Sequence, residues 1–390
     1  MTDVESAGQG FLSGDLLARI RSRAATYDAE NSFPYEDLDD LREAGYLTAM
    51  VPTEFGGGGL TLEQMTAEQR RLAAAAPGTA LAVNMHQVWV AVANAVRATG
   101  DDSVDFVLQE AADGEIFAFG VSEPGNDLVL FASVSEARPD ARPDGGGYTF
   151  HGLKIFTSLA PVWTRLGTFG TDSTGDEPRN VWGFVSREGT EQVGEWDVLG
   201  MRASQSFATK LDGAHAPADR VVRILPPGPT TDPFVVGIFT AFETLLAAVY
   251  TGIAERAIEL ATQTVGKRTS LKNGGAPYSA DPDIRWRLAD AAIQLDSVLP
   301  QLRERAWEFD AGVEVGALTL PRFSAVKSRA TEVALDVVTK AVRVSGGGMY
   351  ANTNELSRLY RDVLAGLFHP SDDESLHGAW ANALLGPVNP

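Results

Sequence analysis

Few side chains in this sequence have the types and spacing that metal or thiol chemistry requires. The chain has no cysteine, so thiolate metal sites, disulfides and cysteine nucleophiles are excluded. Its histidines show none of the spacings typical of metal ligands; they are His86, His151, His215, His369 and His377. The glycines at 56–59 are not followed by the Lys-Ser/Thr pair of a phosphate loop, and we interpret them as a turn. A G-x-G-x-x-G fingerprint and a G-x-S-x-G elbow are also absent from the sequence.

The elements that must position any site change in character along the chain. Apolar residues at helical spacing predict helices in 14–27, 34–45, 62–76, 79–98 and 101–113. From Glu115 to about Pro226, short β-branched or aromatic stretches predict strands. These stretches are EIFAFGVS, YTFHGLKIF, RLGTFGT, NVWGFVS and FATKLDGA, and a hairpin turn is expected at Asp144-Gly145. After the linker 226–229, the spacing predicts helices again, in 281–312 and 324–344.

The predicted fold is therefore of the α+β class with three domains. We expect an N-terminal helical domain in 1–115, a central β domain in 116–226 and a C-terminal helical bundle in 227–390. The long amphipathic helices of the last part should pack antiparallel to one another.

Composition and charge restrict the partners. The net charge is −20 and the pI about 4.6, so we expect neither a nucleic acid nor an anionic membrane as a partner. We expect no membrane span, because no apolar run reaches the roughly 20 residues that a membrane helix needs. The N-terminal MTDVESAGQG does not resemble a secretory signal, and the absence of cysteine fits a cytoplasmic protein.

Several short motifs, in order, resemble those of the acyl-CoA dehydrogenase superfamily. They are VPTEFGGGGL (51–60), FGVSEPGND (119–127), GLKIFTS (152–158), LGMRAS (199–204), SGGGMY (345–350) and LYRDV (359–363). Each motif alone is weak, but the ordered set spans nearly the whole chain. The resemblance implies a helical domain, a β-barrel-like domain and a four-helix bundle, and an oxidoreductase that binds FAD.

The resemblance also assigns the residues around the flavin ring. The loop that begins at Phe119 would hold the pyrimidine edge through backbone groups near Val121 and the Ser122 hydroxyl, where electron density builds on reduction. Phe156 falls where the family usually places a tryptophan against the ring. Ser158 falls where a threonine usually meets flavin N5, with Thr157 beside it.

The FAD tail would be held by a second group of residues. Lys267 and Arg268 lie where the family offers a basic residue to the cofactor of a neighbouring subunit. Gly346 and Gly347 would let the backbone approach the adenosine diphosphate closely. A cofactor shared in this way implies a homo-oligomer, a dimer or a tetramer.

The family's usual catalytic base is missing. Counting from Arg361-Asp362, the place of the family's glutamate holds Pro370, with His369 just before it. Three substitutes for this base are open. The first is Glu243, which lies on the first helix after the β domain, one position from the place used by some relatives. The second is the acidic run 372–374, and the third is His369. A base must face the substrate across the flavin in a dehydrated setting.

His369 also indicates a second enzyme class. Flavin-dependent monooxygenases of the same fold lack the glutamate and carry a histidine in this loop, which RDVLAGLFHP resembles. His86 is a possible second polar contributor, although a buried core histidine is the simpler interpretation. The flavin loop is also shortened after SEPG, where Asn126-Asp127 follows directly.

Three functions follow from these features. The first is FAD-dependent dehydrogenation of an acyl thioester, carried by CoA or a carrier protein, with an electron acceptor protein as partner. The second is a monooxygenase that takes reduced flavin from a flavin reductase and uses O2. The third is a degenerate structural subunit that only binds flavin or acyl groups.

Overall fold

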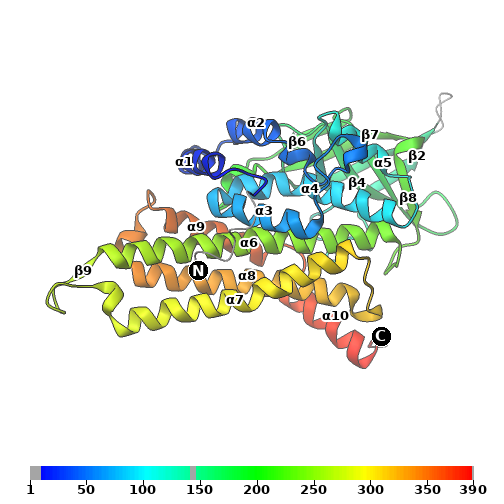
Figure 1. Ribbon diagram of the computed structural model, residues 1–390. Helices are drawn as coiled ribbons and strands as arrows, with labels where there is room; N and C mark the ends of the chain where they lie inside the picture. The colour runs from blue at the N-terminus through cyan, green and yellow to red at the C-terminus, as the bar shows by residue number, and fades with distance from the viewer. Residues whose placement is uncertain (1–9, 141–145, 389–390) are drawn as a thin grey trace.

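Ten α-helices and ten β-strands make up the described part of the chain. The computed structural model describes residues 10–140 and 146–388. The expected hairpin turn at Asp144-Gly145 lies outside the described residues. Helices come first, a sheet follows, and helices end the chain, which is the predicted order (Figure 1).

Five helices precede the sheet, and their ends carry recognisable signals. They are α1 (Gly14–Glu30), α2 (Tyr35–Glu43), α3 (Leu62–Ala75), α4 (Pro77–Ala98) and α5 (Asp105–Ala112). The Ser13 hydroxyl accepts a hydrogen bond from the Leu16 amide at the start of α1. Thr61 and Gln64 form a capping box at the start of α3. Pro77 is the first residue of α4, where its missing N–H has no cost.

The central sheet has eight strands. They are β1 (Phe117–Gly120), β2 (Glu136–Pro139), β3 (Gly147–Thr157), β4 (Arg165–Asp172), β5 (Arg179–Val185), β6 (Thr190–Val193), β7 (Phe207–Pro217) and β8 (Val221–Leu225). The order is β6-β7-β3-β2-β4-β5-β8, and β1 pairs in parallel with β4. Five of these strands, β1, β3, β4, β5 and β7, coincide with the predicted stretches. Strands β2, β6 and β8 were not predicted.

The C-terminal part consists of three long helices and two shorter ones. They are α6 (Pro233–Lys267), α7 (Pro282–Asp310), α8 (Thr319–Ser345), α9 (Glu355–Val363) and α10 (Asp373–Leu385), and a small hairpin, β9 (Thr269–Ser270) and β10 (Ala276–Pro277), joins α6 to α7. Figure 1 shows α6, α7 and α8 side by side, with α3 and α4 between them and the sheet.

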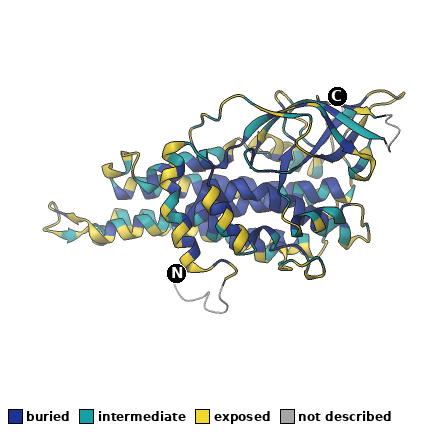
Figure 2. Ribbon diagram, turned by 90° about the horizontal axis from the view of Figure 1, so that it is seen from above, coloured by how far each residue is buried: buried dark blue, intermediate teal, exposed yellow. Residues whose placement is uncertain are grey.

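Helix α4 joins the two halves of the structure. It is buried on almost every face, as expected of a helix that is apolar all round. Its Trp89 donates a hydrogen bond to the Ala118 carbonyl of β1 at 2.8 Å. A Cβ added at Gly167 of β4 would lie 2.2 Å from the Trp89 ring, so glycine is needed there for the helix to reach the sheet. Figure 2 shows this buried layer in dark blue.

Helix α6 corrects one expectation from the sequence. By length and composition alone it could cross a membrane, contrary to the expectation that no stretch was apolar enough. In the structure, 83% of its most apolar window is buried by neighbouring helices. Packing in the bundle therefore accounts for its apolar composition.

Candidate functional site

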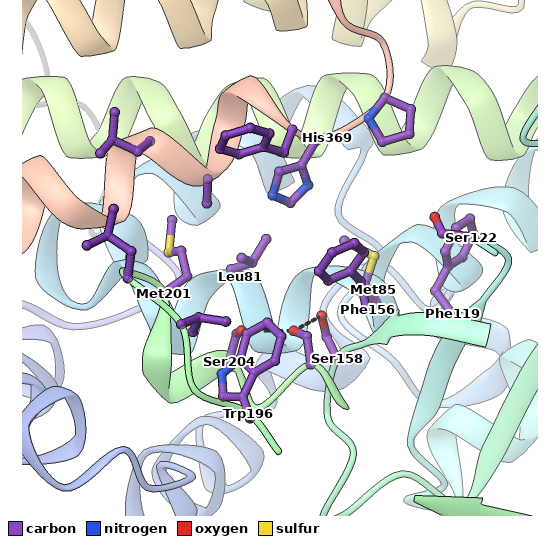
Figure 3. Close-up of a pocket in the computed structure, with 18 of the residues that line it drawn as sticks. Leu81, Met85, Phe119, Ser122, Phe156, Ser158, Trp196, Met201, Ser204 and His369 are labelled. Carbon is purple, nitrogen blue, oxygen red and sulfur yellow. Dashed lines mark hydrogen bonds between the residues drawn. The ribbon is translucent and has the colours of Figure 1, made fainter. Parts of the chain in front are cut away.

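A cavity of about 270 Å³ lies where the sheet, α4, α6 and the segment after α9 meet (Figure 3). Most of its walls are apolar or aromatic, with a few hydroxyls and two titratable side chains. Its lining consists of Leu81, Met85, Phe119, Ser122, Phe156, Ser158, Trp196, Val198, Leu199, Gly200, Met201, Ser204, Ser206, Phe242, Arg361, Leu364, Ala365, Phe368, His369 and Pro370.

The cavity brings together five of the residues singled out in the sequence. They are Phe119, Ser122, Phe156, Ser158 and His369. Val121 and Thr157 are fully buried and do not line the cavity, although the Thr157 hydroxyl has no hydrogen-bond partner. The remaining predicted residues, Glu243, Lys267, Arg268, Gly346 and Gly347, lie outside the lining.

A buried ion pair holds the loop that presents Ser122. Lys154 of β3 donates hydrogen bonds to Glu123 Oε1 at 2.6 Å and to the Phe169 carbonyl at 2.8 Å. Glu123 also accepts hydrogen bonds from the Val134 and Ser135 amides. Both charged side chains are fully shielded from solvent. Glu123 of the SEPG motif and Lys154 of the GLKIFTS motif therefore hold the loop in place.

The pKa values of this pair reflect both burial and pairing. Burial would raise the pKa of Glu123, but the Lys154 charge and hydrogen bonds overcome it and lower that pKa to about 2. Burial lowers the pKa of Lys154 to about 8, partly offset by Glu123. At neutral pH the pair is therefore ionised. The Ile155 amide donates to the Ser122 carbonyl at 2.9 Å, which fixes the loop against β3.

Three serines form a row of hydroxyls on one wall. Ser206 Oγ lies 2.8 Å from both Ser158 Oγ and Ser204 Oγ. Figure 3 shows Ser158 and Ser204 on the side of the cavity opposite His369. Of these three serines, only Ser158 was predicted from the motifs. The alternating Ser-x-Ser at 204–206, one residue after LGMR, was the available signal for the other two.

The Arg-Asp element has a structural role. Asp362 is buried, and its Oδ1 accepts a hydrogen bond from the Met201 amide at 2.6 Å. Arg361 binds both carboxylate oxygens of Asp28 and donates to the Leu199 carbonyl. These contacts hold the turn of LGMRAS against α1 and α9. They also neutralise the one cation in the cavity lining.

His369 projects into the cavity from the segment after the 3₁₀ helix Leu364–Leu367 (Figure 3). Burial and then the charge of Lys327 lower its pKa to about 3. Its ring centroid lies 5.9 Å from that of Tyr250. The imidazole is therefore neutral at physiological pH, with one nitrogen able to donate a hydrogen bond and the other able to accept one.

Glu243 lies on α6 beneath the same segment. Its Oε1 accepts hydrogen bonds from the Ser371 amide at 3.0 Å and the Ser371 hydroxyl at 2.7 Å. Its Oε2 is buried without a partner. Burial raises the pKa of Glu243 to about 7, against the opposing charge of Lys327.

The other open candidates lie elsewhere. His86 is fully buried in α4, where its Nε2 contacts the Leu47 carbonyl at 2.8 Å and its Nδ1 accepts from the Phe117 amide at 3.1 Å, so it is a core histidine. In the acidic run 372–374, Asp372 caps α10 by accepting from the Ser375 amide. Asp127 is exposed.

The cavity has the features that a flavin ring requires. Aromatic side chains from Phe119, Phe156, Trp196 and Phe242 would pack against a flat ring, and the hydroxyls of Ser122 and Ser158 face the same space. The hydroxyl of Thr157, the residue before Ser158, is buried without a hydrogen-bond partner. These residues fit the ring of a flavin.

The residues expected at the FAD tail form a separate cluster. The Arg268 guanidinium donates to the Ser345 carbonyl and lies over the Tyr278 ring. A Cβ at Gly346 would lie 2.4 Å from Arg268 Nη1, so this glycine allows the arginine to pass. Lys267 is exposed. The structure thus joins Arg268 to the glycine turn, away from the cavity lining.

Comparison with known proteins gives a consistent result. Two domain-family models match the chain: the acyl-CoA dehydrogenase N-terminal domain at residues 16–115 and the acyl-CoA dehydrogenase C-terminal domain at residues 244–373. Together they account for more than half of the 390 residues.

Individual relatives have names that describe different reactions. The putative acyl-CoA dehydrogenase YdbM of Bacillus subtilis (strain 168) is 27% identical over 387 residues, covering 95% of each chain. The L-evernosamine nitrososynthase of a Micromonospora species is 29% identical, covering 91% of this chain and 85% of its own. The solved structure of KijD3 with FMN and dTDP-3-amino-2,3,6-trideoxy-4-keto-3-methyl-D-glucose is 25% identical, with a TM-score of 0.84 and coverage of 96% and 92%.

Proposed function

This chain belongs to the acyl-CoA dehydrogenase superfamily of flavin-dependent enzymes, and we propose that it is a flavin-dependent monooxygenase acting on a small molecule. One atom of O2 would enter the substrate and the other would leave as water. The two electrons would come from NAD(P)H through a separate flavin reductase. This reverses the order of the two enzyme classes that the sequence alone favoured.

The observation that carries the proposal is the set of titratable groups around the cavity. Among the described residues, its lining contains no carboxylate, and its titratable groups are Arg361 and His369. Desaturation of an acyl thioester needs a base beside the substrate's α-carbon. Oxygen transfer needs an apolar space and a group that can hold or move a proton, which the neutral His369 supplies.

Each wall of the cavity has a defined part in this function. When bound, a reduced flavin supplies the electrons that activate O2. The Ser122 and Ser158 hydroxyls would hold its polar edge, and Phe156 and Trp196 would pack beside the ring. Arg361, bound by Asp28, carries no free charge to attract an anionic substrate. His369 would hold the proton at the reacting oxygen.

A second candidate function is acyl-thioester dehydrogenation, because Glu243 retains some properties of a base. Its pKa is raised to about 7 and one carboxylate oxygen has no partner. It would have to leave the Ser371 amide and hydroxyl to reach the cavity.

We propose FAD as the form of the flavin, bound in a homo-oligomer. The support is the cluster of Arg268 and Gly346 away from the cavity lining. Such a cluster would serve the distal phosphates of a dinucleotide, or the cofactor of a second subunit, and has no use for FMN.

Oxygen dependence tests the proposed function. With a flavin reductase, NAD(P)H and a panel of small amines, thiols, aromatic compounds and acyl thioesters, we expect NAD(P)H-dependent O2 uptake coupled to product containing ¹⁸O from ¹⁸O2. Without oxygen, we expect no electron transfer from any thioester to an artificial acceptor. Anaerobic bleaching of the flavin by a thioester would instead establish the dehydrogenase.

Replacement of Ser122 by alanine tests the cofactor site. The loss of one buried hydrogen bond should weaken flavin binding by about 1–3 kcal/mol. Dissociation constants for FAD and FMN, measured by flavin fluorescence, should rise together, because both carry the same ring. FAD should bind more tightly than FMN to both proteins. Unchanged constants would show that this loop does not hold the ring.

A further inference from the structure

A buried lysine, Lys327 of α8, lies directly behind the segment that carries His369. Its side chain is 1% exposed. The ammonium donates hydrogen bonds to three carbonyl oxygens, those of Gly366 at 2.9 Å, His369 at 2.5 Å and Ser371 at 3.0 Å. A lysine has three donors, so all of them are spent on the backbone of one short segment.

The same segment is held from the side of α6. Ser371 donates to Glu243 through its amide and its hydroxyl, and its hydroxyl also lies 3.0 Å from Ser324 Oγ. At the other end, a Cβ on Gly366 would lie 2.5 Å from Thr331 and 2.8 Å from Tyr250. Residues 366–371 are therefore fixed at both ends against α6 and α8.

Burial of an ammonium group at this place is costly in free energy. Burial lowers the pKa of Lys327 to about 8, against the opposing charges of Glu243 and Asp372, and the hydrogen bonds of its ammonium group go to carbonyl oxygens. An apolar side chain of similar volume would pack between α6 and α8 at lower cost. What the lysine provides at this cost is the three hydrogen bonds to the carbonyls of one short segment.

We propose, on the basis of the monooxygenase function above, that Lys327 is the positioning residue for His369. It holds the carbonyls of residues 366, 369 and 371 in one arrangement, so that the imidazole points into the cavity. It also places a positive charge behind the ring, which opposes protonation of the imidazole. Glu243, in this arrangement, anchors Ser371 and balances the lysine charge.

The charged and titratable groups around His369 are few. Lys327 of α8 binds the His369 carbonyl, and Tyr250 of α6 packs near its ring. Glu243 of α6 binds Ser371, and Asp372 follows in the same segment and interacts with the charge of Lys327. Arg361 of α9 lines the same cavity but is paired with Asp28. Among the described residues, Lys327 is the cation whose ammonium group contacts the backbone of this segment, and the nearby charges of Glu243 and Asp372 balance its own.

Three variants test the proposal. Lys327→Met removes the donors and the charge at similar length, Lys327→Arg keeps the charge in a planar group that cannot reach all three carbonyls in the same way, and Lys340→Met is the matched control. Lys340 lies on the same helix, but its partners are Asp290 and Asp336. The amount of product formed per NAD(P)H oxidised reports the position of His369, since a displacement of a reacting group by about 1 Å lowers the reaction rate by about 100-fold.

A second measurement does not depend on turnover. The pKa of His369 can be followed by NMR in protein labelled at histidine, with His369→Gln assigning the signal. We expect it to rise in Lys327→Met and to stay low in Lys327→Arg. The product yield per NAD(P)H should fall about 100-fold in Lys327→Met and clearly in Lys327→Arg, and Lys340→Met should match the wild type in both.

The outcomes separate the two proposals. Wild-type yield and pKa in Lys327→Met would overturn the role of Lys327, as would full yield in Lys327→Arg. If Lys327→Met does not fold, Lys327→Arg decides. If the wild type forms no oxygen-dependent product, the monooxygenase proposal fails, and the NMR titration alone still decides whether Lys327 controls His369.

Discussion

Replacement of Lys154 by methionine is expected to destabilise the protein by about 3–5 kcal/mol, because it leaves the carboxylate of Glu123 buried without its cation. The two groups are 2.6 Å apart and neither side chain is exposed to solvent. Glu123 would keep its hydrogen bonds to Ser133, Val134 and Ser135, but these cannot replace a full charge. Chemical denaturation followed by circular dichroism measures the loss.

Two further variants give this prediction its controls. The double substitution Glu123→Gln, Lys154→Met removes both charges and should recover a large part of the lost stability, since the unpaired charge is the main cost. Lys210→Met removes a lysine of β7 whose partner, Asp212, is exposed, and should change stability by less than about 1 kcal/mol. A Lys154→Met protein as stable as the wild type would contradict the assignment of this pair.

Five strands and the long helices α7 and α8 could be predicted because their own sequences carry the signal. Strand β5 is buried along most of its length, and its apolar residues are consecutive. Strands β2 and β6 were not predicted because their own sequences lack this apolar signal. They are four residues each, EARP and TEQV, mostly polar and exposed, and only pairing with β3, β4 and β7 defines them.

The candidate site was predictable only where a motif lies on the cavity. Ser122, Phe156, Ser158 and His369 lie on such motifs and line the cavity, and their roles toward a flavin stay predictions. They could not show that Glu123, Lys154 and Asp362 hold backbone in place, because hydrogen-bond partners are not visible in a sequence. Lys327 was missed altogether, since its partners follow it by 39 to 44 positions and share no pattern with it.

Replacement of His369 by alanine is expected to separate NAD(P)H oxidation from product formation. The cavity keeps its apolar walls, so flavin and oxygen can still react, but no group remains to hold the proton at the reacting oxygen. Loss of one general acid or base costs about 100- to 10,000-fold, so product should fall by about that factor while NAD(P)H oxidation continues. The missing oxidising equivalents should appear as hydrogen peroxide, which a peroxidase-coupled assay measures.

Two substitutions decide whether this loss reflects the histidine's chemistry. His369→Gln can still donate a hydrogen bond but cannot move a proton, so product should stay low if proton movement is what matters. Glu243→Gln keeps an oxygen that can accept from Ser371, so we expect it to form product, with a lower stability because the charge that balances Lys327 is lost. If Glu243→Gln instead abolishes α-proton exchange in an acyl thioester while His369→Ala has no effect, the carboxylate is the base and the enzyme is a dehydrogenase. The monooxygenase and dehydrogenase proposals thus predict opposite results for His369→Ala and Glu243→Gln in the same pair of assays.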